Sequence, residues 1–330
     1  MKPANQIIKE NIVIDNAFGF EPEIEVPHKW EVIDRFKNVG FTHMSLSIAT
    51  DMTSLSNTMH YLAEVTETIK QNPDKYILVK SYDDILNAKT ENKLALSFMF
   101  QGTNPLEKRL ELVDVFSALG VRSMILTYNA RNAMGDGVIE TNDAGLSRLG
   151  KMLVKKMNSA GMIIDLSHTG IKTSLEAIEL STKPVIFSHS NVHRLHPHVR
   201  NLTDEQIKLV AAKNGFIGIN GNSPLLGDEN ALISKYVDHM EYIIQLVGDD
   251  FVGLGTDLVY FPEIFDLFMK KNSVVYPNNY GVQQVSQIRS IQPEQLGEIV
   301  SELQNRGYKE KSIAKILGGN YMRVAKETFI

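Results

Sequence analysis

The sequence contains no cysteine among its 330 residues. Disulfide bonds, thiolate metal ligands and a cysteine nucleophile are therefore excluded. The fold has to be stabilised by its core, and any catalytic chemistry has to come from other residue types.

The sequence also lacks a strong charge excess and a long apolar run. Its 34 basic and 39 acidic residues give a net charge of −5, which offers no argument for binding nucleic acid or an anionic membrane. No stretch approaches the length of a transmembrane helix, and the first eleven residues are too polar for a signal peptide. With 43% hydrophobic and 22% charged residues, we expect a soluble globular protein in the cytoplasm that acts on a small molecule.

No Gly/Ser-rich linker and no low-complexity segment divides the chain. Instead, eight short apolar runs alternate with amphipathic segments, which is typical of buried parallel strands and their crossover helices. We therefore predict one (β/α)₈ TIM barrel domain over residues 1–330, with an open doubly wound sheet as the alternative. The predicted strands are Ile12–Asp15, His43–Ile48, Leu94–Phe100, Ser123–Thr127, Met162–Asp165, Val185–Phe187, Gly215–Ile219 and Val252–Leu254.

The remaining segments are assigned as helices, loops or insertions. Amphipathic patterns predict helices at Ser54–Gln71, Leu106–Leu119 and Leu146–Met157, and Thr203 begins a capped helix. The segment 261–291 is long, aromatic and irregular, so we expect a lid or an insertion that faces a dimer partner. Helices at 293–306 and 309–329 end the chain, and the polar loop 129–142 is expected to border the mouth of the barrel.

Two successive predicted strands each end in a Ser-His pair. His168 follows Met162–Asp165, and His189 follows Val185–Phe187. Because parallel strands end at the same edge, where α/β proteins place their chemistry, both imidazoles should face one mouth. The simpler interpretation, two hydrogen-bonded histidines in βα loops, is less favoured because the pattern is repeated.

Polar residues follow most of the other predicted strands. Two imidazoles and a carboxylate suit zinc or another divalent metal. Asp257 could accept the proton of a metal-activated water, and Arg200 could bind a substrate carboxylate through its bidentate guanidinium. The residues at the predicted strand ends are Asp15, Gln101, Tyr128 with Asn129, His168, His189, Asn220 and Asp257.

Each of these assignments has a structural alternative. Asp257 could cap a helix, and Arg200 could be an ordinary surface ion-pair residue. Asp15, just inside a strand end, is expected to be a structural hydrogen-bond acceptor. The crowded loop histidines His193, His196 and His198 are expected to be solvated.

Five motifs occur in order along the chain: residues 163–168 (IIDLSH), 184–190 (PVIFSHS), 200–202 (RNL), 252–257 (VGLGTD) and 317–324 (LGGNYMRV). Together they resemble the membrane (renal) dipeptidase family of metallopeptidases, a branch of the amidohydrolase-like barrels. The resemblance implies a zinc site, hydrolysis of short peptides and frequent homodimers. It also implies that His168 and His189 hold one metal, that Arg200 binds the substrate carboxylate and that Asp257 is the acid/base.

The sequence departs from the family pattern at four places. A His-x-Asp pair expected after the first strand is replaced by Ala17-Phe18-Gly19, which removes two metal ligands. The carboxylate that bridges the two metals is Gln101, an expected histidine is Tyr128, and a second aspartate is replaced at Val259. A binuclear centre is therefore not expected.

We predict a mononuclear metallohydrolase that cleaves an amide bond in a dipeptide-like molecule. The expected roles are metal binding by His168, His189, Gln101 and Asp257, catalysis by Asp257 and Tyr128, and substrate binding by Arg200, Asn129 and Asn220. The metal is expected to be one Zn²⁺ or another divalent ion. The alternative is a catalytically inactive relative that binds a peptide-like ligand, and a third reading is an open iron site.

Overall fold

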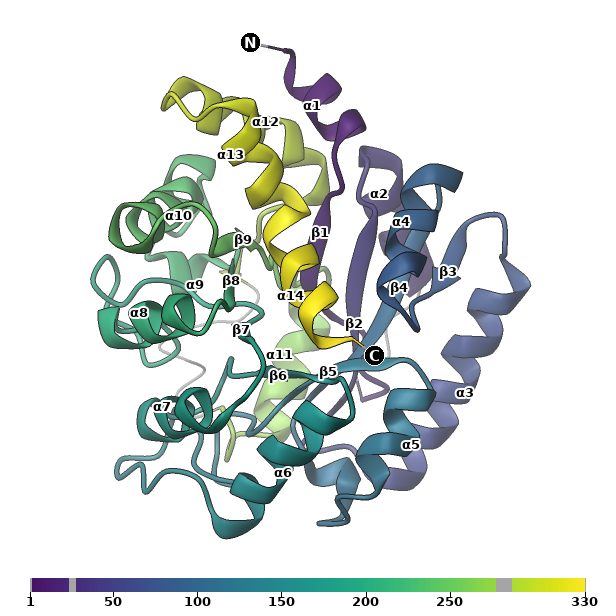
Figure 1. Cartoon of the computed structure of the whole chain (residues 1–330), viewed down its shortest axis with the longest axis vertical. Helices are drawn as coiled ribbons and strands as arrows, with labels where there is room; N and C mark the ends of the chain where they lie inside the picture. The colour runs from purple at the N-terminus through teal and green to yellow at the C-terminus, as the bar shows by residue number, and fades with distance from the viewer. Residues whose placement is uncertain (1, 24–27, 277–286, 330) are drawn as a thin grey trace.

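The computed structural model describes residues 2–23, 28–276 and 287–329, and its centre is a sheet of parallel strands (Figure 1). The strands are hydrogen-bonded in the order β1-β2-β4-β5-β6-β7-β8-β9, and β3 pairs with β4 outside this path. Helices surround the sheet, so the predicted (β/α)₈ barrel is confirmed. The strands are β1 (Ile14–Gly19), β2 (His43–Thr50), β3 (Tyr76–Leu78), β4 (Leu94–Gln101), β5 (Val121–Ile125), β6 (Ile163–Asp165), β7 (Val185–Phe187), β8 (Phe216–Ile219) and β9 (Val252–Leu254).

Side-chain and loop hydrogen bonds join β9 to β1. Asn16 Nδ2 donates to the carbonyl of Leu254 at 2.8 Å. The buried carboxylate of Asp15 accepts hydrogen bonds from the Thr256 amide at 3.2 Å and the Thr256 hydroxyl at 2.5 Å. These bonds connect the first and last strands, and Asp15 has the structural acceptor role that was expected of it.

The first strand lies further along the chain than predicted. It covers Ile14–Gly19 rather than Ile12–Asp15, so Asp15 lies within the strand and not at its end. The carboxyl end of β1 is instead followed by Phe20 and Glu21. The short outer strand β3 was missed because three residues carry no readable alternation.

The predicted helix Leu106–Leu119 was also wrong in its first half. A 3₁₀ turn, η1 (Asn104–Leu106), ends at Glu107 and Lys108, which have φ of 47° and 64°. Two residues in the left-handed region cannot continue a right-handed helix. The α-helix α5 therefore starts only at Leu112 and runs to Ala118.

The crossover helices lie outside the barrel. Helix α3 begins after Ser54, whose side chain accepts from the Asn57 amide, and α8 begins with a capping box between Thr203 and Gln206. The helices are α1 (Ala4–Glu10), α2 (Lys29–Val39), α3 (Leu55–Gln71), α4 (Tyr82–Glu91), α6 (Arg148–Ser159), α7 (Ile171–Leu180), α8 (Asp204–Ala212), α9 (Ser223–Leu226), α10 (Ile233–Val247), α11 (Pro262–Lys271), α12 (Leu296–Asn305), α13 (Glu310–Ala314) and α14 (Asn320–Thr328).

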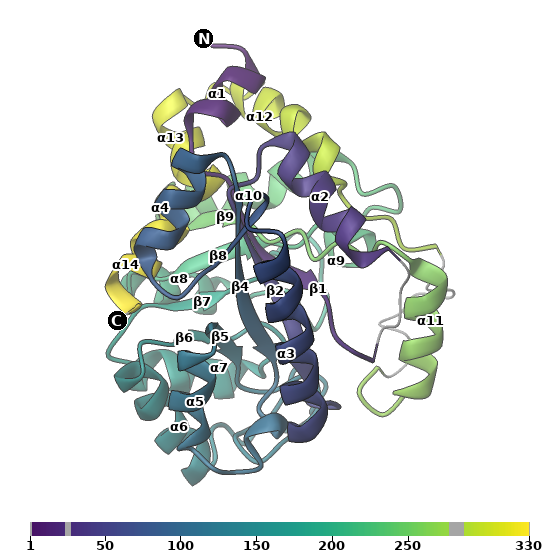
Figure 2. The same ribbon diagram turned by 90° about the vertical axis from the view of Figure 1, so that its right-hand side faces the viewer.

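The last helix covers the amino end of the barrel. A π-helical turn, η5 (Lys315–Gly319), leads into α14, where Tyr321 stacks on His43 at the start of β2 with ring centroids 5.6 Å apart. Figure 2 shows α14 and α11 on opposite sides of the molecule. The carboxyl end of the barrel, where α11 lies, is therefore the open end.

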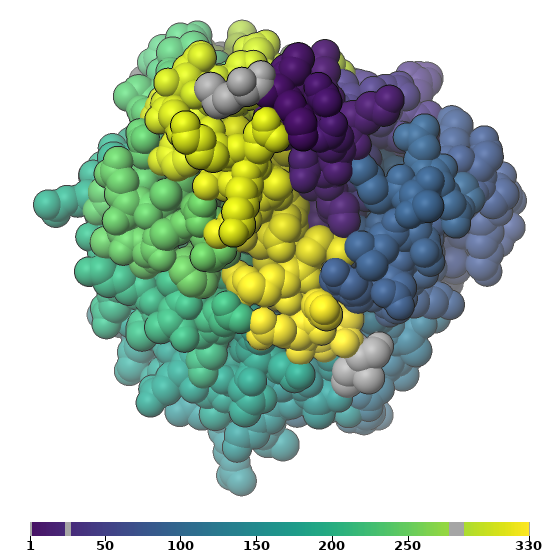
Figure 3. Space-filling model, turned by 45° about the horizontal axis from the view of Figure 1, so that its top comes forward, coloured from purple at the N-terminus to yellow at the C-terminus, as the bar shows by residue number. Residues whose placement is uncertain are grey.

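The first residues of the chain and α1 lie beside α12 and α13, as the purple and yellow atoms in the space-filling view show (Figure 3). Gln304 Nε2 on α12 donates to the carbonyl of Lys2 at 2.8 Å, and the Lys2 ammonium pairs with Glu310 at 3.2 Å. Within the described part of the chain, no helix is both long and apolar enough to cross a bilayer.

The segment 261–291 is more regular than predicted. Residues 262–271 form the helix α11, which presents Phe268 and Met269 to the interior. Residues 277–286 lie outside the described residues, so the expected lid or dimer-facing role of this segment stays a prediction.

Candidate active site

A pocket opens at the carboxyl ends of the strands, next to α11. One part of its wall is polar and ionisable, and the other part is aromatic and aliphatic. The polar residues are Glu21, Thr50, Gln101, Tyr128, His168, Arg200, Asn222 and Asp257, and the apolar or aromatic ones are Leu225, Leu258, Val259, Tyr260, Phe261, Phe265, Phe268, Met269, Tyr276 and Ile288.

His168 and His189 face each other at the edge of this pocket. Their Nε2 atoms are 2.8 Å apart. The Nδ1 atom of His168 is 2.6 Å from Asn129 Oδ1, and the Nδ1 atom of His189 is 2.7 Å from Ser188 Oγ. Two nitrogen lone pairs repel at this distance, so one of the two Nε2 atoms has to carry a proton that it donates to the other.

Both imidazoles are held in the neutral form. Burial lowers the pKa of His168 and of His189 well below the usual value, and the nearby positive charge of Arg200 lowers each pKa further. Neutral imidazole is the form that binds a metal.

Asp257 follows β9 and lines the same pocket. Its Oδ2 atom accepts hydrogen bonds from Asn220 Nδ2 at 2.9 Å and from Asn222 Nδ2 at 3.2 Å. Burial raises the pKa of Asp257 to about 7, although the Arg200 charge and the Asn220 hydrogen bond oppose this shift. A carboxyl with this pKa can both accept and return a proton near neutral pH.

Arg200 brings a buried positive charge to the pocket. Its side chain is only 3% exposed, and Nη2 donates to the carbonyl of His189 at 3.2 Å. Within the described ranges, no Asp or Glu forms an ion pair with Arg200. Since a buried guanidinium is costly without an anion, the pocket is suited to a ligand carboxylate.

Glu21 is a pocket residue that the sequence analysis missed. Its Oε1 atom accepts hydrogen bonds from Ser47 Oγ at 2.5 Å and from Gln101 Nε2 at 3.3 Å, whereas the buried Oε2 atom has no partner. Burial raises the pKa of Glu21 to about 7, and the Ser47 hydrogen bond opposes the shift. The sequence analysis missed Glu21 because it ended the first strand at Asp15. The strand in fact ends at Gly19, two residues before Glu21.

Three residues around the pocket have an unusual backbone. Asn129, His168 and Asp257 have φ of 59°, 64° and 51°, in the left-handed region that non-glycine residues rarely adopt. Such conformations cluster at functional sites, where the surrounding structure enforces them.

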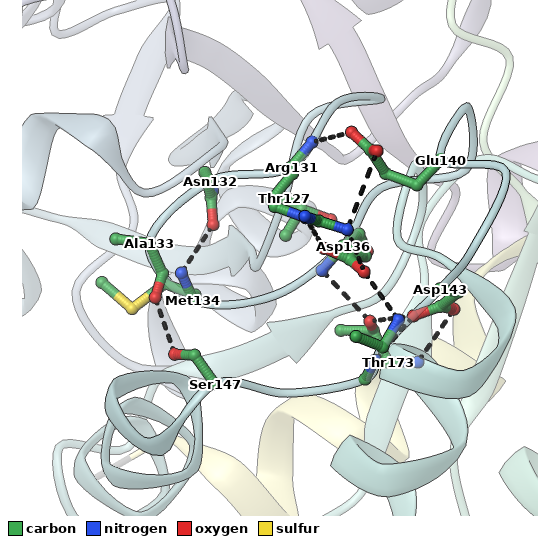
Figure 4. A network of polar contacts seen from close by, with 12 residues as sticks. Thr127, Arg131, Asn132, Ala133, Met134, Asp136, Glu140, Asp143, Ser147 and Thr173 are labelled. Carbon is green, nitrogen blue, oxygen red and sulfur yellow. Dashed lines mark hydrogen bonds and ion pairs between the residues drawn. The ribbon is translucent and has the colours of Figure 1, made fainter.

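The loop after β5 is held by its own polar network, shown in Figure 4. Arg131 forms an ion pair with the buried carboxylate of Asp136. Its Nη2 atom donates a second hydrogen bond to Asp136 Oδ2 at 3.0 Å. Thr173 on α7 donates to Asp143 at 2.7 Å, and Ser147 donates to the carbonyl of Ala133 at 2.6 Å. These bonds anchor the loop between β5 and α6.

The predicted site residues have different positions relative to the pocket. Gln101, Tyr128, His168, Arg200 and Asp257 line it. The remaining three predicted residues lie behind these: His189 bonds to His168, Asn129 to the other nitrogen of His168, and Asn220 to Asp257.

The two facing imidazoles supply two candidate ligands for one metal ion. Two converging imidazoles with both Nδ1 atoms hydrogen-bonded are the usual arrangement of zinc-binding histidines. Nitrogen ligands of a tetrahedral zinc lie roughly 3.3 Å apart, so a small opening of the pair is enough. Where the resemblance places two further ligands, β1 carries Ala17 and Gly19. Among the described residues, no group of three or more His, Asp or Glu is arranged to hold a metal ion, so the two imidazoles are not joined by a third such ligand.

Comparisons with known proteins bear on the family and the fold. The model of the membrane dipeptidase family (Peptidase family M19) matches residues 35–266. Dipeptidase tcpJ of Claviceps purpurea is 28% identical over 280 residues, which are 83% of this chain and 60% of that protein. Dipeptidase verJ of Clonostachys rogersoniana is 28% identical, over 82% of this chain and 65% of its own length. The chain thus spans less than two thirds of both fungal dipeptidases.

Solved structures share the fold over the full chain. An amidohydrolase from Pseudomonas aeruginosa is 28% identical, with a TM-score of 0.87 and coverage of 99% of both chains. A metallo peptidase from Rhodobacter sphaeroides, liganded with a phosphinate mimic of the dipeptide L-Ala-D-Ala, has a TM-score of 0.77 at 18% identity, covering 96% of this chain and 99% of its own. The second likeness supports the fold alone.

Proposed function

Because the chain belongs to the membrane dipeptidase family, a family of hydrolases, we propose that it cleaves the amide bond of a small dipeptide-like molecule. The observation that carries this proposal is the facing pair His168 and His189, with Nε2 atoms 2.8 Å apart beside the pocket that Asp257 and Arg200 line. The family and its metallopeptidase structures imply a divalent metal.

We propose that one ion, zinc or another divalent metal, is held by Nε2 of His168 and of His189. The amide oxygen of Gln101 or water would complete the coordination, and Asp257 would lie close to the ion. When bound, such an ion polarises a carbonyl oxygen and lowers the pKa of a water molecule.

The protein's own residues supply the remaining roles. Asp257, with a pKa of about 7, takes a proton from the attacking water and returns it to the leaving amine. Arg200 binds the ligand carboxylate, and the Tyr128 hydroxyl donates a hydrogen bond to the reacting group. Asn129 and Asn220 orient His168 and Asp257 through the hydrogen bonds described above.

The second candidate function is a binding protein for a peptide-like ligand without catalysis. It is favoured by a hydrogen-bond chain that satisfies both imidazoles without a metal. In this chain Ser188 donates to His189 Nδ1, His189 Nε2 donates to His168 Nε2, and His168 Nδ1 donates to Asn129 Oδ1.

Elemental analysis of protein purified without added metal separates the two functions. We expect about one zinc per chain in the wild type and none in His168→Ala, because two imidazoles are the main ligands. His193→Ala, which changes an exposed histidine away from the pocket, is the control and should keep its metal. No metal, and no turnover of dipeptides after zinc is added, would establish the binding protein instead; iron in place of zinc would favour an iron enzyme.

Three further features remain proposals from the sequence. They are a single domain over residues 1–330 with 261–291 as a lid or interface insertion, a homodimer, and a cytoplasmic location. Sedimentation of the purified protein tests the dimer, limited proteolysis tests the single domain, and cell fractionation tests the location.

A further inference from the structure

The pocket contains a carboxyl group that the proposed hydrolysis does not use. Glu21 is only 3% exposed and lines the same pocket as His168, Arg200 and Asp257. It is not one of the residues that the family motif supplies, because the motif positions on β1 are occupied by Ala17 and Gly19. Its role therefore has to be inferred from its surroundings.

Only one of the two carboxyl oxygens of Glu21 has hydrogen-bond partners. Ser47 and Gln101, both neutral, donate to Oε1, and Oε2 is buried without a hydrogen-bond partner. Lys29 is the basic residue close enough to act on it electrostatically, but the Lys29 ammonium donates to the main-chain carbonyl of Glu21 at 2.8 Å. Among the described residues, no cation forms an ion pair with the Glu21 carboxylate.

Arg200 has the complementary property in the same pocket. It is a buried cation that forms no ion pair in the described part of the chain, although its charge acts on Asp257, and Glu21 is a buried carboxyl that forms no ion pair there, although Lys29 acts on it. Buried charges are normally paired because the loss of hydration is costly. A pocket with both groups unpaired, and with apolar walls around them, is complementary to a ligand that carries one positive and one negative end.

We propose that Glu21 binds the free ammonium group of the substrate, while Arg200 binds its carboxylate. The inference rests on the proposed function and adds to it a specificity-determining residue, Glu21, for the unblocked amine. An ammonium group has three N–H donors, so one of them supplies the hydrogen bond that Oε2 lacks. A ligand whose amine is acylated has no positive charge for Glu21 and leaves the buried carboxyl unpaired.

The experiment measures binding, so that it does not depend on turnover. The probes are a phosphinate dipeptide analogue with a free amine and the same analogue with an N-acetyl group, titrated calorimetrically against the protein as purified. A charge-assisted hydrogen bond predicts that the wild type prefers the free amine by roughly 10- to 100-fold. In Glu21→Gln the preference should fall to within about threefold, since the amide keeps the shape but has no charge.

Glu64→Gln is the control. Glu64 is exposed on α3 and does not line the pocket, so this variant should keep the wild-type preference. We also expect Glu21→Gln to unfold at a higher denaturant concentration than the wild type, because it removes an unpaired buried carboxyl. A residue with a purely structural role would lose stability on substitution and would leave the amine preference unchanged.

The two proposals fail in different ways. Equal affinity of the wild type for both probes, or an unchanged preference in Glu21→Gln, overturns the role of Glu21 even if dipeptides are hydrolysed. A preference that depends on Glu21, together with no hydrolysis of any dipeptide, supports the role of Glu21 and overturns the hydrolase.

Discussion

The ring of Tyr128 stacks on the imidazole of His168, with centroids 4.2 Å apart and planes inclined by 25°. The Tyr128 hydroxyl is hydrogen-bonded to the hydroxyl of Tyr276. The ring of Tyr128 therefore restrains the orientation of the His168 imidazole. Its hydroxyl lies where the polar wall of the pocket meets the aromatic wall.

Tyr128→Phe keeps the stacked ring and removes the hydroxyl. If that hydroxyl donates to the substrate, kcat/KM should fall by roughly 10- to 100-fold, since one donor to a developing charge is lost. Tyr276→Phe provides the comparison, because it removes the same hydroxyl–hydroxyl bond from the other side. Equal losses in both variants would mean that the Tyr128 hydroxyl only supports Tyr276.

The aromatic wall predicts a preference for bulky apolar ligands. Phe265 on α11 packs edge-on against Tyr276, with centroids 6.2 Å apart, and lines the pocket. Phe265→Ala should weaken binding of a dipeptide analogue with a phenylalanine side chain by about tenfold, or roughly 1.4 kcal/mol, while an alanine analogue changes little. Leu267→Ala, on the same helix but 67% exposed, is the control. The same loss for both analogues would argue against a specificity role.

Asp51 connects three strand ends beneath the pocket. It follows β2, and its carboxylate accepts the amides of Thr103 at 2.7 Å and Tyr128 at 2.9 Å and the Asn132 side chain at 2.9 Å. Asp51→Ala leaves these buried donors unpaired, so we expect a loss of about 2–4 kcal/mol in the free energy of unfolding. Urea unfolding measures this loss; a change below about 0.5 kcal/mol would show that water replaces the carboxylate.

Burial of His43 predicts a loss of stability in acid. Its Nε2 atom is 2.9 Å from Ser97 Oγ, its Nδ1 atom has no partner, and burial lowers its pKa to about 3. The unfolded chain takes up this proton near pH 6.5 and the native protein only near pH 3, so stability falls as pH decreases through this window. At pH 4.5 the loss from this one histidine is about 2–3 kcal/mol.

Urea unfolding at pH 7 and pH 4.5 tests the role of His43. In His43→Gln the difference in unfolding free energy between the two pH values should be smaller than in the wild type by about 2 kcal/mol. His60→Gln, at an exposed position on α3, should retain the wild-type difference. An unchanged difference in His43→Gln would assign the acid sensitivity to other groups.

The sequence predicted the architecture because eight apolar runs alternate with amphipathic segments, and β7 and β9 have the predicted bounds. It also placed His168 and His189 at adjacent strand ends, and their facing geometry follows from the parallel order of β6 and β7. Glu21 was missed because its position depends on where β1 ends, and strand ends are poorly marked in a sequence. Asn129 is hydrogen-bonded to His168, and Asn220 to Asp257. These contacts join residues far apart in the sequence, so no local sequence pattern predicts them.

The left-handed backbone at Asn129, His168 and Asp257 has an energetic consequence. Each such conformation costs a non-glycine residue of the order of 1 kcal/mol, which glycine would not bear. Glycine at these three places would relieve that backbone cost but would also remove the buried side chains, with their hydrogen bonds and the stacking of His168 on Tyr128. The backbone cost is therefore the condition under which these three side chains are presented at the open end of the barrel.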